Sequence, residues 1–214
     1  VSLLCAGDEQ MIEDKVLGIP FFKFDLPDKD KVEDIYNVMQ TLPFIPNDTN
    51  EIWAGGSDLY KNPDLRYLFD WMQDCMVEVS HSMGIPNKMV CVSAWANKNK
   101  QGDWFYNHTH PNCFMSSNYY VSGTTGTTKW YYPNPYYDKT NIWPFPAGEW
   151  DDTFNLTHEE PTVPGRYIVF PPTIRHKATE NEESCDRITV AANWFPTGNI
   201  FYNGVSHLNI EVIQ

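Results

Sequence analysis

The spacing of hydrophobic and polar positions changes near residue 86 of the 214-residue chain. Before that point, apolar residues recur at helical spacing in residues 30–42 and again in residues 62–84. Asn62 suits a helix N-cap, and Pro63 fits the first helical position. The pattern therefore predicts two helices in the N-terminal third, preceded by a short extended segment within residues 15–27.

After residue 86, short β-prone runs alternate with Gly, Pro, Asn and Asp and predict seven or eight strands. Strands that follow a helical N-terminal third indicate a mainly β fold, a barrel or jelly roll with helices packed on one sheet. We expect a single domain whose parts are N-terminal strand and helical support (1–86), a β core (87–196) with an insertion (133–164), and a C-terminal extension (197–214). The insertion is rich in aromatic residues and proline, and it is either a lid over the barrel mouth or a structural cover.

Charge and composition narrow the functional classes. The formal net charge of −13 argues against a broad phosphate-binding surface, so nucleic acid is not expected as the main partner. The sequence contains no run of about 18 apolar residues, so it predicts no membrane span. The five cysteines are odd in number and form no CxxC motif, which favours free thiols in a reducing compartment. We therefore expect a cytoplasmic protein.

Two histidines stand two residues apart in the stretch "NHTHPN" (107–112). If residues 103–110 form a strand, His108 and His110 project from the same face and can occupy adjacent positions around one metal ion. His176 follows an apolar strand and a double proline, and in a jelly roll that strand can lie beside the first. Three neutral nitrogen ligands would leave the opposite coordination positions open. The alternative is that two polar side chains merely share a strand face.

Arg187 lies in the strand-like run "DRITVAANWF" (186–195). Alternation places Arg187 and Thr189 on one face of that strand and the apolar Ile188 and Val190 on the other. An arginine that points into an apolar barrel is costly unless an anion meets it, and its planar group suits a carboxylate. The alternative is an arginine on the outer face, or one paired with an acidic residue.

Five short motifs occur in a specific order between residues 88 and 196. They are "SAWANKNK" (93–100), "HTHP" (108–111), "SSNYYVSG" (116–123), "VFPPTIRH" (169–176) and "DRITVAANW" (186–194). In these motifs the sequence resembles the Fe(II)- and 2-oxoglutarate-dependent oxygenases. It is most similar to a group of small members that phages and marine bacteria often encode.

The resemblance implies a double-stranded β-helix with one ferrous ion at its open end. It implies iron ligands at His108, His110 and His176, and a 2-oxoglutarate co-substrate that chelates iron through its keto acid. The remaining implied roles are binding of the far carboxylate by Arg187, Thr189 and Tyr120, and polar lining of the site by Asn97 and Asn193. The wider superfamily has His-x-Asp or His-x-Glu where this chain has His110, so a third imidazole replaces the usual carboxylate.

The expected reaction couples dioxygen and 2-oxoglutarate to hydroxylation of a peptidyl residue such as proline, or of a small metabolite. A cupin-like three-histidine metalloenzyme that uses no 2-oxoglutarate is one alternative, and Arg187 would then be structural. A non-catalytic jelly-roll binding module, such as a virion component, is another. Such a module needs neither the histidine triad nor an inward-facing Arg-x-Thr.

Overall fold

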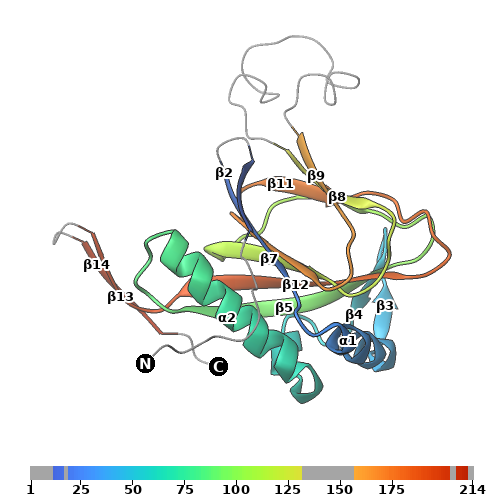
Figure 1. Cartoon of the computed structure of the whole chain (residues 1–214), viewed down its shortest axis with the longest axis horizontal. Helices are drawn as coiled ribbons and strands as arrows, with labels where there is room; N and C mark the ends of the chain where they lie inside the picture. Colours follow the sequence, from blue (N-terminus) through green and yellow to red (C-terminus); the bar gives the residue numbers. More distant parts are fainter. Residues whose placement is uncertain (1–11, 17–18, 132–156, 203–205, 212–214) are drawn as a thin grey trace, which may run out of the picture.

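The computed structural model describes residues 12–16, 19–131, 157–202 and 206–211. Its helices all lie in the N-terminal part of the chain (Figure 1). They are α1 (Lys29–Thr41), the short 3-10 turns η1 (Leu59–Lys61) and η2 (Pro63–Leu65), and α2 (Arg66–Ser82). The 3-10 turn η2 leads directly into α2. Asn62 caps the start of η2, as predicted, because its side chain accepts a hydrogen bond from the Asp64 amide.

Two antiparallel sheets form the body of the molecule. The larger has the order β1 (Ile12–Val16), β2 (Ile19–Asp25), β10 (Arg166–Phe170), β7 (Met115–Tyr120), β12 (Arg187–Pro196), β5 (Met89–Asn99), β4 (Glu51–Trp53), β3 (Phe44–Pro46). The smaller has the order β6 (Phe105–His108), β11 (Arg175–Ala178), β8 (Thr127–Tyr131), β9 (Thr157–Pro161). A separate hairpin of β13 (Gly198–Tyr202) and β14 (Ser206–Ile210) extends away from the sheets (Figure 1).

The predicted fold class is confirmed. The chain is mainly β with N-terminal helices, and its two facing sheets form a double-stranded β-helix, or jelly roll. After residue 86 the described residues contain ten strands, β5 to β14, rather than the expected seven or eight. The strands that the pattern did not predict are short, such as β3 and β4 with three residues each and the polar β9 with five, so their sequences carry little periodicity.

The larger sheet has two differently used faces. Ile188, Val190 and Trp194 of β12 pack with the two long helices in the main hydrophobic core. The alternate residues of the same strand, including Arg187, point to the other face and line an internal cavity. The pleat therefore separates a helix-covered apolar face from an interior face that is free to carry polar side chains.

The insertion expected at 133–164 lies mainly outside the described residues, so its role as a lid or cover stays a prediction. Its described end is not a loop, because residues 157–161 form β9 and pair with β8.

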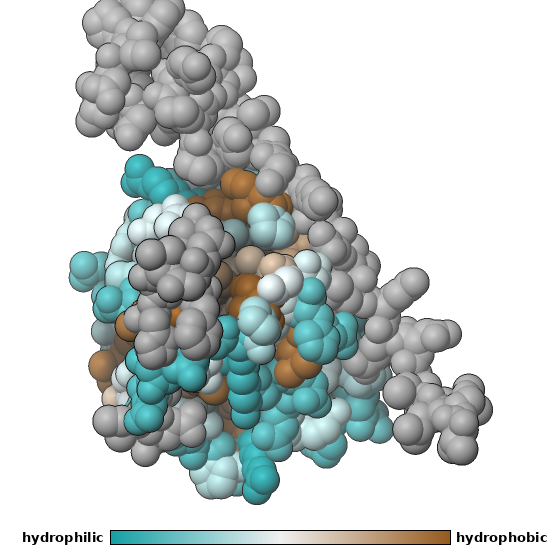
Figure 2. All heavy atoms as spheres, turned by 90° about the vertical axis from the view of Figure 1, so that its left-hand side faces the viewer, coloured by the Kyte–Doolittle hydropathy of each residue, from teal (hydrophilic) through white to brown (hydrophobic). Residues whose placement is uncertain are grey.

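Of the helices in the described part of the chain, none combines the length and apolar character that crossing a membrane requires. On the face shown in Figure 2, hydrophobic residues gather near the middle and hydrophilic residues surround them.

Candidate active site

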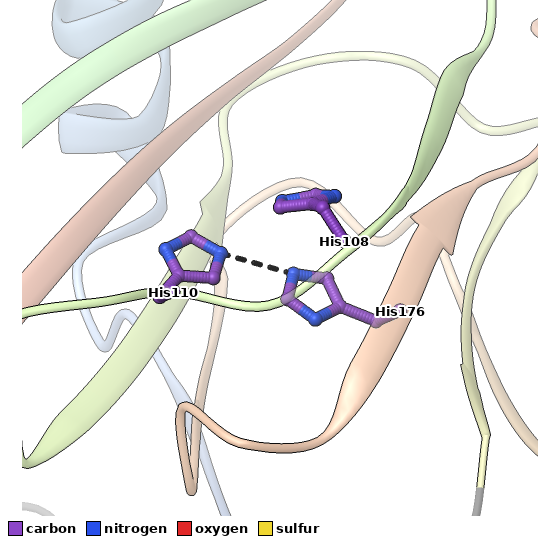
Figure 3. Close-up of side chains that lie close together, drawn as sticks. All are labelled: His108, His110 and His176. Carbon is purple, nitrogen blue, oxygen red and sulfur yellow. Dashed lines mark hydrogen bonds between the residues drawn. The ribbon is translucent and has the colours of Figure 1, made fainter. Parts of the chain in front are cut away.

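Three histidines converge at one end of the space between the sheets. One nitrogen each from His108, His110 and His176 lies within 4.8 Å of the others. The Nε2 atoms of His110 and His176 are 3.1 Å apart. Figure 3 shows the three rings close together, with the His110 and His176 nitrogens joined by the dashed line. Three imidazole nitrogens this close together are suited to hold a transition metal ion.

Two of these histidines are placed by strand pairing, and the third is not. His108 is the last residue of β6, and it lies directly opposite His176 on β11. We predicted that a strand would extend to His110, and this prediction is wrong, because β6 ends two residues earlier. The His110 amide instead donates to the Pro172 carbonyl oxygen at 3.0 Å, and this contact holds the residue beside the other two.

The Nδ1 atoms of His108 and His176 are held by backbone groups. His108 Nδ1 lies 2.9 Å from the carbonyl oxygen of Tyr106, and His176 Nδ1 lies 3.0 Å from that of Ile174. A carbonyl oxygen only accepts, so each Nδ1 carries the proton and each Nε2 keeps its lone pair. Metal-binding histidines are commonly oriented through the second ring nitrogen in this way.

His110 has a different support. Its side chain forms a hydrogen bond with the side chain of Asn193, and the Asn193 Oδ1 atom also accepts a bond from Ser116 Oγ at 3.0 Å. The Trp95 ring stacks on the imidazole, with ring centroids 5.5 Å apart. His110 is therefore held by a side-chain network rather than by a backbone carbonyl.

All three imidazoles are neutral near pH 7. Burial lowers the pKa of His110 to about 4, although the bond to Asn193 opposes this shift. Burial also lowers the pKa of His108, and it lowers that of His176 well below its usual value. A neutral imidazole offers the lone pair that a metal ion needs, so burial prepares these side chains for coordination.

Arg187 is buried in the same cavity without an acidic partner. The cavity runs from the histidines to this side chain, which is 2% exposed. Arg187 Nη2 donates to the Thr179 carbonyl oxygen at 2.6 Å, whereas Nη1 is buried and has no hydrogen-bond partner. Within the described residues no carboxylate pairs with it, and burial lowers its pKa. The interior placement predicted for Arg187 is confirmed, and both alternatives, an outer position and an acidic partner, do not hold in the described residues.

Residues around Arg187 come from adjacent strands in register. Thr189 lies opposite Asn97 on β5 and opposite Tyr120 on β7, and all three line the cavity. The hydroxyl groups of Tyr120 and Thr128 are 2.7 Å apart. The sequence thus identified a group of residues that the structure brings together at this end of the cavity.

Asn193 lies elsewhere. It borders a second, open cavity that His108 and His110 also line, together with Trp95, Tyr106 and Pro111. We predicted that Asn97 and Asn193 would both line the site as polar residues. In the structure they line two different cavities. Among the described residues that line this open cavity there is no Lys, Arg, Asp or Glu.

Two glycines make room for the guanidinium group, and their sequence context carries no signal of this role. A Cβ atom on Gly126 would lie 2.0 Å from Arg187 Nη1 and 2.7 Å from the Glu180 carbonyl oxygen. Gly126 also has a φ of +72°, which a side chain would strain. A Cβ atom on Gly123 would come within 3.0 Å of Arg187 Cβ. The small residues therefore define the space that the arginine fills.

The segment that carries this site matches a known protein family. The family model described as "Putative 2OG-Fe(II) oxygenase" matches residues 93–193. This segment is a 2OG-Fe(II) oxygenase domain. The matched range of the oxygenase domain contains the three histidines, Arg187 and most of the cavity lining. A search of curated proteins by sequence found no match.

Solved structures of oxygenases have the same fold as this chain. HygX from Streptomyces hygroscopicus, bound to nickel, 2-oxoglutarate and hygromycin B, is similar with a TM-score of 0.61 at 12% identity, over 83% of each chain. A Pseudomonas putida prolyl-4-hydroxylase gives 0.57 at 8% identity, over 86% of this chain and 97% of the other. The 2-oxoglutarate-dependent epimerase SnoN from nogalamycin biosynthesis gives 0.60 at 8% identity, over 87% and 82%.

Proposed function

We propose that the protein is an Fe(II)- and 2-oxoglutarate-dependent dioxygenase that hydroxylates an organic substrate. One observation carries this proposal. A single cavity has three neutral imidazoles at one end and a buried arginine without an acidic partner at the other. A dicarboxylate that chelates a metal through one end requires this arrangement, with a metal site at one end of the cavity and a cation at the other.

The donor set fits a ferrous ion. In this proposal His108, His110 and His176 are the ligands, and three imidazoles suit a borderline first-row metal better than Ca²⁺ or Mg²⁺, which prefer oxygen. Their Nδ1 and side-chain hydrogen bonds fix the rings before the metal arrives. Ligands on one side only leave other positions for co-substrate and dioxygen.

The far end of the cavity fits 2-oxoglutarate. Its distal carboxylate would pair with Arg187 and supply the acceptor that Nη1 lacks. Thr189 and Tyr120 line the same end and offer hydroxyl donors. The likeness to HygX, whose structure contains nickel and 2-oxoglutarate, supports this choice of co-substrate.

Bound iron would supply the activation of dioxygen that converts 2-oxoglutarate to succinate and carbon dioxide. One oxygen atom then enters a substrate C–H bond as hydroxyl, and the other enters succinate. The chain's own contribution is to bind and orient: Arg187 fixes the co-substrate, and the walls of the cavity, such as Phe170 and Trp95, exclude water.

The substrate would enter through the open cavity beside His108 and His110. A peptidyl residue such as proline, or a small metabolite, is the class we propose. The similar structures support both options, because one is a prolyl-4-hydroxylase and another contains hygromycin B. Since SnoN is an epimerase, the fold alone leaves the outcome of the reaction to experiment.

Anaerobic titration of the apoprotein with Fe(II) and then 2-oxoglutarate tests the binding part of the proposal. Chelation of the keto acid should produce a weak visible charge-transfer band in the wild type, and the His176→Ala variant should give none. His81→Ala is the matched control, because His81 is exposed on α2. No band in the wild type, or an undiminished band in His176→Ala, would refute this function. Metal binding without 2-oxoglutarate binding would favour the cupin-like alternative.

Hydroxylation itself needs a product measurement. Incubation of the iron-loaded protein with labelled dioxygen, 2-oxoglutarate and a panel of prolyl peptides and small metabolites should yield succinate. A product that has gained one labelled oxygen atom would establish the hydroxylase. Succinate formation with a rearranged or epimerised product would retain the oxygenase and overturn hydroxylation.

A further inference from the structure

We propose that Asn99 is a second anchor for the distal carboxylate of 2-oxoglutarate and acts together with Arg187. This inference rests on the proposed function and adds a binding residue to it. Asn99 is the last residue of β5. Neither the motif pattern nor the arginine alone identifies it.

Strand pairing places Asn99 beside Arg187. The two residues are direct cross-strand partners in the antiparallel pair of β5 and β12, so their side chains leave the same face of the sheet. Both line the cavity that contains the histidines. Each is only 2% exposed, so water has little access to either group.

Both side chains have an unused donor. Asn99 Nδ2 and Arg187 Nη1 are buried and have no hydrogen-bond partner in the described structure. Native proteins rarely leave such groups unsatisfied, because a buried donor that has given up its hydrogen bonds to water without gaining a partner destabilises the folded state. Two such donors from paired positions in one cavity indicate a ligand with two acceptor atoms close together. A carboxylate has this geometry.

The polarity of the cavity determines how the ligand lies. The histidine end offers neutral nitrogen lone pairs for a metal, and the opposite end offers the unmatched donors of Asn99 and Arg187. A dicarboxylate would therefore place its chelating keto acid at the histidines and its other carboxylate at the arginine and asparagine. A monocarboxylic keto acid would leave both donors unsatisfied.

Asn97 provides the matched comparison. It lies two residues earlier on the same strand and lines the same cavity, but it pairs with Thr189 rather than Arg187. Its Oδ1 atom already accepts a hydrogen bond from Asn50 Nδ2 at 3.3 Å. Asn97 is also half-buried, whereas Asn99 is buried. The same substitution at the two positions should therefore have different effects on ligand binding.

The backbone around Asn99 is fixed by a separate contact. Its carbonyl oxygen accepts a hydrogen bond from Asn181 Nδ2 at 3.0 Å, and Asn181 is itself completely buried. This contact uses the main-chain oxygen of Asn99 and survives substitution of its side chain. Removal of the Asn99 amide should therefore leave the strand end in place, and its effect should be confined to the cavity.

The experiment compares two keto acids in the Fe(II)-loaded protein under anaerobic conditions, with the charge-transfer band as readout. One is 2-oxoglutarate, and the other is 2-oxopentanoate, which has a methyl group in place of the distal carboxylate. In Asn99→Ala we expect affinity for 2-oxoglutarate to fall about tenfold or more, as expected for loss of a hydrogen bond to a charged group. Affinity for 2-oxopentanoate should not change. Asn97→Ala should weaken 2-oxoglutarate binding less than Asn99→Ala does.

Asn99→Asp is the second variant, since it keeps the size of the side chain and places a negative charge beside the carboxylate. It should show at least the same selective loss, and its fold can be checked by circular dichroism. Unchanged 2-oxoglutarate affinity in both variants, or an equal loss for both keto acids, would overturn the role of Asn99. Absence of the band in the wild type would overturn the proposed function as well, so the two failures are distinguishable.

Discussion

His108 and His176 are direct cross-strand partners on β6 and β11, although a long stretch of sequence separates them. The pairing brings their rings to a centroid distance of 4.4 Å. Because backbone hydrogen bonds of a sheet fix this distance, the two nitrogen donors are in place before any metal binds. Pre-positioning of this kind lowers the entropy cost of coordination.

Loss of either of these histidines should abolish tight metal binding. Substitution of a residue that only supports a metal ligand typically weakens metal binding by about 10–100-fold. We expect His108→Ala and His176→Ala to weaken Ni(II) or Fe(II) binding by more than this, because each removes a ligand. Isothermal titration of the apoprotein measures this directly. His81→Ala should bind like wild type, and a comparable loss in that variant would point to a general effect of histidine removal.

Asn193 should position the third histidine. We expect Asn193→Leu to weaken metal binding about 10–100-fold, because His110 loses the hydrogen bond that orients its ring. Asn193→Asp preserves an acceptor and should retain binding. Titration with Co(II) gives both the affinity and the visible spectrum of the metal site, which reports ligand geometry. An unaltered spectrum and affinity in Asn193→Leu would show that Trp95 stacking alone holds the ring.

The residues at the arginine end of the site could be predicted from the sequence, because successive side chains of a strand point to opposite faces of the sheet. Period-two alternation in 186–195 placed Arg187 and Thr189 on one face, and both line the cavity. No such local rule identifies Asn99. Asn97 and Asn99 share a face of β5, and only the register against β12 shows which of them meets Arg187. Register depends on long-range pairing, which a single sequence does not display.

The histidine end shows the same limit. The His-x-His spacing suggested a strand that would place both side chains on one face, yet β6 ends at His108. His110 is held at the site by a hydrogen bond that its backbone amide donates to the Pro172 carbonyl oxygen. This contact joins two loops. The strand β9 was also missed, because its polar sequence resembles a loop. Its Glu160 is buried and pairs with Lys23 and His158, which explains how a charged strand fits the sheet.

Arg187 should serve co-substrate binding at the expense of stability. We expect Arg187→Met to lose nearly all affinity for 2-oxoglutarate, because the buried carboxylate would lose its charged partner. The apo variant should unfold at a temperature no lower than wild type, since a desolvated cation without an acidic partner is removed. Differential scanning calorimetry with and without Ni(II) and 2-oxoglutarate separates the two effects. A much lower melting temperature in the apo variant would instead mean that the bond to Thr179 is a major stabilising contact.

Thiol reactivity should follow burial. Cys185 is exposed, whereas Cys91 is buried, and burial raises the pKa of Cys91 to about 12. Burial also raises the pKa of the half-buried Cys113 to about 11. The hydrogen bond to the Glu183 side chain raises the pKa of Cys185, but this thiol is exposed. Because the thiolate is the reactive form and must also be accessible, iodoacetamide at pH 8 should label Cys185 before the other cysteines of the described residues, and Cys91 only after unfolding. Peptide mass spectrometry over a time course measures the order, and rapid labelling of Cys91 in the native protein would contradict its burial.

Gly126 should be required for co-substrate binding although it touches no part of the proposed metal site. A Cβ atom at this position would lie 2.0 Å from Arg187 Nη1, so Gly126→Ala must displace the guanidinium group. Gly84 is the matched control, because it has a similar φ of +67° and a Cβ atom there would have nothing within 4 Å. Both variants should therefore lose about 1–2 kcal/mol of stability from backbone strain, and Gly126→Ala should lose more, because its Cβ atom would also lie 2.7 Å from the Glu180 carbonyl oxygen.

Only Gly126→Ala should also weaken 2-oxoglutarate binding, and by about tenfold or more, because a displaced charged partner no longer meets the carboxylate. Urea unfolding measures the shared loss of stability, and the anaerobic charge-transfer titration measures the specific loss of affinity. Affinity for 2-oxopentanoate should be equal in the two variants. If both glycine variants bind 2-oxoglutarate equally well, the position of the Arg187 guanidinium group does not control co-substrate affinity, and the carboxylate must depend on other donors in the cavity.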